Sequence, residues 1–89
     1  MNKRQLVERV AQQTSFSLRK TEEVLNALLF SISEALAEGK TLRLAGFGTF
    51  KVVEKKGRRA RNPRTGEIIQ VPPRRFVKFV PGKRLRELV

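Results

Sequence analysis

Residues 55–75 read KKGRRARNPRTGEIIQVPPRR, and this stretch decides how the remainder of the chain is interpreted. Its centre, residues 62–66 (NPRTG), is typical of a chain reversal and predicts two extended limbs folded about it. The first limb has Ala60 as its only aliphatic residue, whereas the second has Ile68, Ile69 and Val71, so the limbs can pair as a hairpin but can bury little. We therefore expect the ribbon to need a ligand for its order; a disordered basic loop is the alternative for the unbound protein.

Positive charge is concentrated in the same stretch. The 89 residues include 20 Lys and Arg against 8 acidic residues, a net charge of +12. Residues 1–45 hold 7 basic and 5 acidic residues (+2), residues 46–89 hold 13 and 3 (+10), and residues 55–75 alone hold 8 and 1 (+7). A cluster of like charges without a partner only repels itself, so this distribution indicates a polyanionic partner, and nucleic acid is the first candidate.

Several residue types that carry chemistry are missing from the sequence, which has no Cys, no His and no Asp. Disulfides, Cys- or His-based metal sites and the commonest general base are thereby excluded. No Ser or Thr stands beside a plausible base, so we expect a protein that is not an enzyme and that uses no metal or cofactor. The apolar runs are short and the N-terminus lacks a signal-peptide core, which predicts a soluble intracellular protein with no membrane partner.

Two helices are predicted in the first 39 residues. Asn2 can cap the first, with Gln5 three residues later to complete a capping box, and this helix ends near Gln13. Ser17 can cap the second, which stops at Gly39. Apolar or small residues recur three and four apart along the second helix, with more of their kind beside them: Leu18, Thr21, Leu25, Leu28, Ile32 and Ala35, flanked by Val24, Leu29, Phe30 and Leu36.

This apolar arc is wider than one neighbouring helix can cover. We interpret the surplus as a subunit interface, most simply a two-fold dimer in which the helix packs against its own copy. The alternative is that the chain's own sheet covers the arc, and composition leaves both possibilities open.

Three strands are predicted after the helices. Residues 41–45 and 49–54 alternate in polarity on either side of the turn at residues 46–48, and residues 76–80 form the third strand. The second strand is expected to run on into the ribbon, which returns through Arg74 and Arg75 into the third. Parity separates a core side from a second side that is not purely polar: Phe50, Val52, Val77 and Phe79 on the first, Lys51, Val53, Phe76, Lys78 and Val80 on the second.

A short basic helix over residues 83–88, with Leu85 and Leu88 inward, completes the chain. We therefore predict one α+β domain over residues 1–89, with two N-terminal helices, a three-stranded antiparallel sheet that carries a long β-ribbon arm, and a C-terminal helix. The expected parts are a helical dimerisation base (1–39), a sheet or saddle (40–54 and 76–81), an arm for binding nucleic acid (55–75) and the terminal helix (82–89).

The arm is the strongest candidate for a nucleic-acid contact. A two-stranded ribbon is narrow enough to enter a groove, and its cations can reach phosphates on either side. At its tip, Pro63 offers a rigid ring that could wedge between base pairs; the alternative is that this proline only shapes the turn. The cations of the arm are Lys55, Lys56, Arg58, Arg59, Arg61, Arg64, Arg74 and Arg75.

Other candidate contacts give weaker signals. Gly46 and Gly48 could bring backbone N–H groups close to a phosphate, and Gly82 with Lys83 could do the same at the start of the last helix. Phe47, Phe50 and Phe79 could stack on single-stranded bases, but the parity of Phe50 and Phe79 favours a place in the core instead.

Three motifs are residues 46–50 (GFGTF), 61–67 (RNPRTGE) and 79–83 (FVPGK). Together with their spacing they resemble the bacterial histone-like HU and integration host factor family of DNA-bending proteins, and HU in particular. The resemblance covers the whole chain, and the arm motif is highly specific. It implies an intertwined dimer whose two arms wrap the minor groove, each Pro63 inserting between base pairs at about a few kcal/mol per unstacked step, a magnitude already known for this family.

The resemblance also assigns roles by position. Contacts with the DNA backbone or groove are expected from Lys3, Gly46, Gly48, Lys51, Lys55, Lys56, Arg58, Arg59, Arg61, Asn62, Pro63, Arg64, Arg74, Arg75, Lys78, Gly82, Lys83 and Arg86. The dimer core is expected to contain Leu25, Leu28, Leu29, Ile32, Leu44, Phe47, Phe50 and Phe79.

Four positions depart from the usual pattern of the family. Val53 and Val80 stand where basic residues are common, so the corresponding saddle contacts differ here. Ala60 replaces a frequent glycine of the arm, and Pro73 follows Pro72 where a small residue is usual, which predicts a stiffer base of the arm.

We predict a non-enzymatic, nucleoid-associated architectural protein that binds and bends duplex DNA through phosphates and deformability, with little base readout. It is expected to be a homodimer in the bacterial cytoplasm, or in an organelle of bacterial origin, that compacts or stabilises DNA and prefers bent, nicked or distorted duplexes. A sequence-specific bending subunit like integration host factor is one alternative. A basic RNA-binding protein is the other, and weak RNA binding is compatible with the main prediction.

Overall fold

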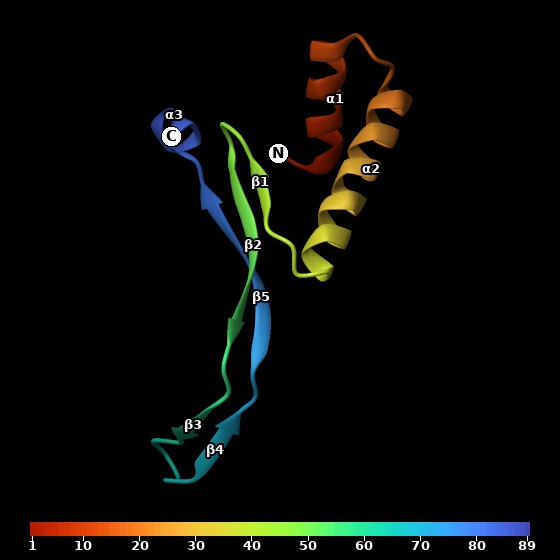
Figure 1. Ribbon diagram of the computed structural model, residues 1–89. Helices are drawn as coiled ribbons and strands as arrows, with labels where there is room; N and C mark the ends of the chain where they lie inside the picture. Colours follow the sequence, from red (N-terminus) through yellow and green to blue (C-terminus); the bar gives the residue numbers. More distant parts are fainter. The chain divides into compact units, whose positions relative to one another are not determined.

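A computed structural model describes residues 1–89 and has the element order that the α+β prediction requires (Figure 1). The chain divides into two units, residues 1–35 and 36–89, which are described separately. No helix is both long enough and apolar enough to cross a membrane. The elements are α1 (Lys3–Thr14), α2 (Leu18–Ala37), β1 (Leu42–Leu44), β2 (Gly48–Lys55), β3 (Arg58–Arg61), β4 (Ile68–Val71), β5 (Arg74–Pro81) and α3 (Lys83–Leu88).

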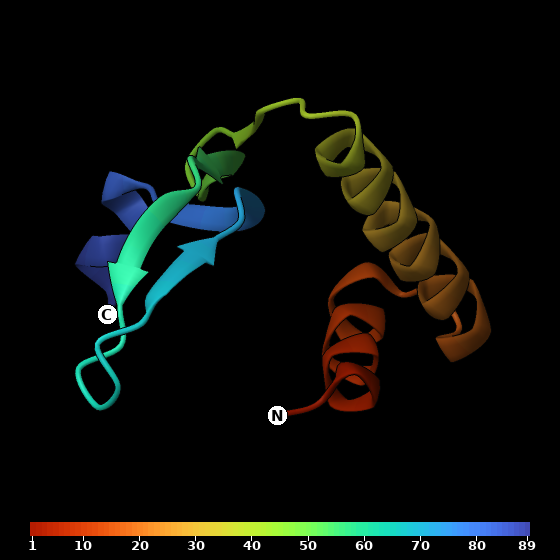
Figure 2. The same ribbon diagram turned by 90° about the horizontal axis from the view of Figure 1, so that it is seen from below.

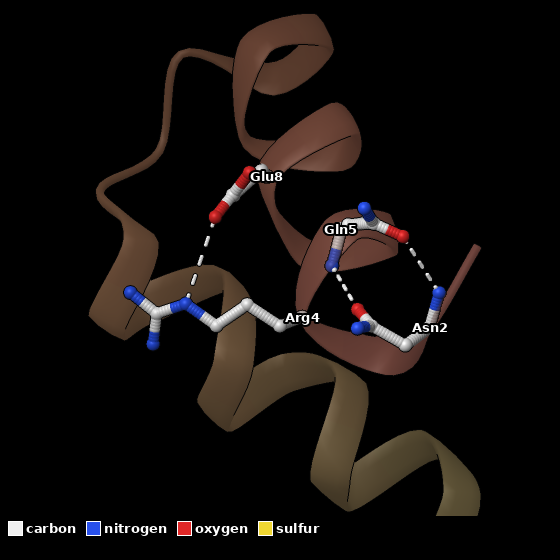
Figure 3. A network of polar contacts seen from close by, with 4 residues as sticks. All are labelled: Asn2, Arg4, Gln5 and Glu8. Carbon is white, nitrogen blue, oxygen red and sulfur yellow. Dashed lines mark hydrogen bonds and ion pairs between the residues drawn. The ribbon is translucent and has the colours of Figure 1, made fainter.

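The first helix begins at the predicted capping box, drawn in Figure 3. The backbone N–H of Gln5 donates to Asn2 Oδ1, and the backbone N–H of Asn2 donates to Gln5 Oε1, both at 2.9 Å. These two bonds satisfy donors that the first turn of a helix otherwise leaves free. One turn further on, Arg4 Nε lies 3.6 Å from Glu8 Oε1, an exposed ion pair that contributes little to stability.

Helices α1 and α2 form a helical hairpin (Figures 1 and 2). Ser17 caps α2 as predicted, since its Oγ accepts the Lys20 N–H at 3.1 Å. Val7 and Ala11 of α1 are buried together with Thr21 of α2, whose hydroxyl is satisfied by the Ser17 carbonyl at 2.9 Å. No other apolar side chain of the protein is fully buried, so this unit has a very small core.

The apolar arc of α2 therefore remains largely uncovered by α1, its neighbour in this unit. Leu25 and Ile32 are half-buried, whereas Leu28 and Leu29 are exposed and Phe30 retains 65% of its accessible surface. Isolated exposed apolar residues are ordinary, but a contiguous stripe along a 20-residue helix is typical of an interaction surface.

The second unit contains an antiparallel sheet of three strands in the order β1-β2-β5, as predicted. Leu44 of β1 pairs with Gly48, and the whole of β2 pairs with the whole of β5, from Gly48 opposite Pro81 to Lys55 opposite Arg74. This sheet includes Lys55, Arg74 and Arg75, so it extends further toward the tip than the range we expected for the saddle.

The second strand runs on into the first residue of the ribbon, Lys55, and the ribbon is then interrupted. Strands β3 and β4 form a separate two-stranded sheet, with Arg58 opposite Val71 and Arg61 opposite Ile68. The break lies where Pro72 and Pro73 occupy the returning limb. Proline has no N–H to donate to a strand ladder, so pairing stops at these residues and resumes on either side of them.

Candidate nucleic-acid interface

The register of β2 with β5 gives the sheet two faces of different chemistry. Residues directly opposite each other share a face, so the pairs Phe50–Phe79, Val52–Val77 and Glu54–Arg75 lie on one side, which we call the aromatic face. The ring centroids of Phe50 and Phe79 are 4.6 Å apart, and the Phe79 ring also lies 5.5 Å from that of Phe47. The three phenylalanines thus pack on one another, as expected of core residues, and are not spread out as separate stacking platforms.

The opposite side of the sheet, which we call the basic face, carries four rows of side chains. Two rows are cationic and two are apolar or mixed, and no acidic residue lies on this face. Strand β1 adds Arg43 to the first row because Arg43 pairs with Thr49. The rows are Arg43–Thr49–Val80, Lys51–Lys78, Val53–Phe76 and Lys55–Arg74.

The second row places two like charges directly across from each other. Cβ atoms of opposite residues in an antiparallel pair are about 4.5–5.5 Å apart, and like charges in this arrangement destabilise a sheet. The Lys51–Lys78 pair has no acidic side chain within 4.0 Å to neutralise it. A bound polyanion would turn this repulsion into attraction, which makes the row the clearest electrostatic sign of a ligand on the sheet.

The arm continues the positive charge beyond the sheet. Arg58 shares one face of the β3–β4 ribbon with Ala60, Ile69 and Val71, whereas Arg59 and Arg61 lie on the other face with Ile68 and Gln70. All three arginines are exposed. Cations on both faces can meet phosphates on both sides of a groove, the geometry anticipated for an inserted ribbon.

The tip of the arm is a tight, locally bonded turn. The Asn62 N–H donates to the Glu67 carbonyl at 2.9 Å, the Gly66 N–H donates to the Asn62 carbonyl at 2.8 Å, and Asn62 Oδ1 accepts the Arg64 N–H at 2.9 Å. Gly66 has a φ of +75°, a conformation that favours glycine. Asn62 therefore stabilises the turn. Pro63, which follows it, is exposed at the end of the ribbon.

Of the three arm cations in the β2–β5 sheet, Arg75 is the one that the register separates from the other two. It lies on the aromatic face, where its Nε is 3.6 Å from Glu54 Oε1. Its neighbours Lys55 and Arg74 lie on the basic face, and Lys56 lies in the interrupted segment between the two sheets.

The glycines of the sheet have packing roles that the sequence did not reveal. A Cβ atom on Gly48 would lie 2.6 Å from the Phe79 ring and 2.7 Å from the Val80 carbonyl oxygen, so only glycine fits there. Gly46 forms the turn before it, and the Gly82 N–H donates to the Phe47 carbonyl at 2.8 Å. The Gly82 N–H is thus already engaged within the chain.

A concave surface of about 690 Å³ joins the end of the sheet to α3. Lys83 and Arg84 line it together with Arg43, Gly46 and Gly48. Lys83 was among the contacts predicted from the sequence, whereas Arg43 and Arg84 were not, and the predicted Arg86 does not line this surface. The signal for Arg43 was available in its parity, because it alternates with Leu42 and Leu44 of the aromatic face.

The remaining predicted residues lie on the helices and on β1. Lys3 is in the other unit, where it lines a small hollow with Arg4, Val7, Leu18 and Glu22. The residues expected in the dimer core are all described, and none is fully buried within the single chain: Leu25, Leu28, Leu29, Ile32, Leu44, Phe47, Phe50 and Phe79.

Comparison with known proteins gives one consistent result. The family model described as bacterial DNA-binding protein matches residues 1–89. DNA-binding protein HU-1 of Halalkalibacterium halodurans is 42% identical over 89 residues, which cover 100% of this chain and 99% of that protein. DNA-binding protein HU of Geobacillus stearothermophilus is 39% identical with the same coverage.

Solved structures agree with the sequence relatives. The chain in the Anabaena HU–DNA cocrystal structure superposes with a TM-score of 0.86 at 41% identity, covering 99% of this chain and 96% of that one. HU from Thermotoga maritima superposes with a TM-score of 0.71 at 32% identity, covering 99% and 97%.

Proposed function

We propose a function from the premise that this chain belongs to the bacterial DNA-binding protein family that includes HU. In this proposal the chain is a non-enzymatic architectural protein that binds and bends duplex DNA with little sequence preference. The observation that carries the proposal is the set of cationic rows on the basic face together with the exposed arginines of the arm. Phosphates are the sequence-independent part of DNA, and a surface of this kind recognises them without reading bases. The proposed location is the bacterial nucleoid.

We also propose that the working form is a homodimer. Val7 and Ala11 are the only fully buried apolar residues of the chain, too small a core to offset the conformational entropy of 89 residues. Pairing of the α2 stripe and of the aromatic faces between two copies would cover what the single chain leaves exposed. Sedimentation equilibrium is expected to give twice the chain mass of 10.2 kDa; a folded species at the chain mass would contradict this proposal.

In this proposal, the arm bends DNA by inserting Pro63 between base pairs. Unstacking costs about a few kcal/mol per step, as established for this family of architectural proteins, and the bent duplex recovers it by contacting more cationic surface. The exposed position of Pro63 at the tip of an arginine-rich ribbon supports this role.

The test is the bend produced by Pro63→Ala, measured by fluorescence energy transfer between the ends of a labelled duplex. The variant is expected to shorten the end-to-end distance less than the parent does, with a smaller effect on loose association. Thr65→Ala is the matched control, because it alters the same turn without removing a ring; Thr65 Oγ1 only accepts the Glu67 N–H at 3.3 Å. Equal bending by the parent and Pro63→Ala would contradict the wedge role. An equal loss of bending in Pro63→Ala and Thr65→Ala would show that Pro63 only shapes the turn.

A further inference from the structure

The basic face is interrupted by an apolar row. Val53 and Phe76 lie directly opposite each other between the cationic rows Lys51–Lys78 and Lys55–Arg74. Val53 is half-buried and Phe76 keeps 37% of its surface accessible. An aromatic ring and a branched aliphatic side chain surrounded by cations on an open sheet face require a ligand that is apolar at its centre and anionic at its edges.

We propose that the Val53–Phe76 row contacts the sugar edges of the minor groove and selects 2′-deoxyribose over ribose. This inference rests on the proposed binding of duplex DNA and adds a discrimination that phosphate contacts cannot supply. The groove has the required chemistry, because sugar C–H groups line it and phosphates form its two rims.

The spacing of the rows allows this arrangement but does not match the groove directly. Side chains on one face of a strand recur every two residues, so adjacent rows are about 6.7 Å apart and the two cationic rows about 13 Å apart. The minor groove is about 6 Å wide. With the apolar row over the opening, the Lys and Arg side chains must lean inward by about 3.5 Å on each side to reach the rims, and their long, flexible stems permit this.

The selection follows from the 2′-hydroxyl, which lies in the minor groove of an RNA helix and is the group that distinguishes RNA from DNA. Pressed against the Val53 methyls and the Phe76 ring, this hydroxyl would lose its water and find no partner. A closed hydrophobic pocket rejects an added hydroxyl by only about a hundredfold, and an open face rejects it less. We expect the row to contribute about tenfold to the preference for DNA.

The experiment compares the Kd of the full-length protein for three duplexes of one sequence: DNA, DNA with ribonucleotides at alternate positions of both strands, and RNA. The variants are Val53→Thr, which keeps the shape of valine and replaces one methyl group with a hydroxyl, and the double variant Val53→Thr/Phe76→Thr. Val89→Thr makes the same chemical change at a fully exposed position outside the face. The DNA-to-ribonucleotide affinity ratio of each variant is divided by that of the parent. This cancels the effect of helical form, because every protein is tested on the same three duplexes.

The DNA-to-ribonucleotide affinity ratio is expected to fall about tenfold in the double variant, partly in Val53→Thr, and not at all in Val89→Thr. If the double variant does not unfold cooperatively, the same comparison is made with Val53→Thr alone. Unchanged ratios in the folded variants would overturn this inference, as would equal binding of DNA and RNA by the parent. Absence of DNA binding by the parent would instead overturn the proposed function.

Discussion

Neutralising one lysine of the Lys51–Lys78 row is predicted to stabilise the free protein and to weaken its binding of DNA. The substitution is Lys78→Gln, which keeps much of the length of the side chain and removes its charge. In the free protein the two ammonium groups face each other across the strands with no carboxylate within 4.0 Å. Cross-strand pairs of this kind change stability by about 0.2–1 kcal/mol, so the free energy of unfolding should rise by a few tenths of a kcal/mol.

The effect on binding follows from counterion release. Each phosphate contact contributes about 0.9 to the slope of log K against log salt concentration, so a homodimer that loses two Lys78 contacts should lose about 1.8 from the slope. Between about 50 and about 200 mM salt, a fourfold change, the affinity difference between parent and variant should therefore shrink about 12-fold. Thermal unfolding without DNA and fluorescence anisotropy with a short duplex across this salt range measure the two effects.

Lys40→Gln is the matched control. Lys40 belongs to the same unit but lies off the sheet, and its Nζ is 2.8 Å from Glu38 Oε2. Its loss should leave stability unchanged or slightly lower, by less than about 1 kcal/mol, and leave the salt slope unchanged. The reasoning fails if Lys78→Gln destabilises the free protein as Lys40→Gln does, or if both variants retain the parent's salt slope.

Three further variants test the architecture. Gly48→Ala is expected to lower the free energy of unfolding by about 1–3 kcal/mol, because its Cβ would overlap Phe79; chemical denaturation measures this, and a parent-like midpoint would contradict the close packing. Asn2→Ala should cost about 1 kcal/mol through the capping box, whereas an unchanged melting curve would show that α1 does not depend on its cap. Deleting residues 57–72 should leave a folded dimer that binds DNA weakly, since β3 and β4 form their own sheet; a monomeric or unfolded product in sedimentation would refute that independence.

Local patterns in the sequence predicted most of the fold. The capping residues Asn2 and Ser17 gave the helix starts, and alternation gave the strands and the separation of Phe50 and Phe79 from Lys51. These features depend on neighbours a few residues away, which is why periodicity can detect them.

The features that local patterns did not predict depend on pairing between distant segments. Arg75 shares a face with Phe79 and Glu54, because the register extends the sheet past the expected boundary. The break between the two sheets had a visible signal in Pro72 and Pro73, whose missing N–H groups were interpreted only as stiffness. The packing role of Gly48 requires knowing that the Phe79 ring lies over it, which no local pattern gives.

The function proposed here depends on the register of one strand pair. Alternate residues of β2 face opposite sides, so a slip of one residue would bring Phe50 to the basic face and Lys51 among the aromatic rings. The protein fixes this register at the end of the sheet farthest from the arm. Gly48 accommodates the Phe79 ring, and the Gly82 N–H binds the Phe47 carbonyl. These contacts align the lysines of the basic face, and they do so without any need for Gly48 or Gly82 to touch DNA. Substitutions at Gly48 should therefore impair stability and DNA binding together.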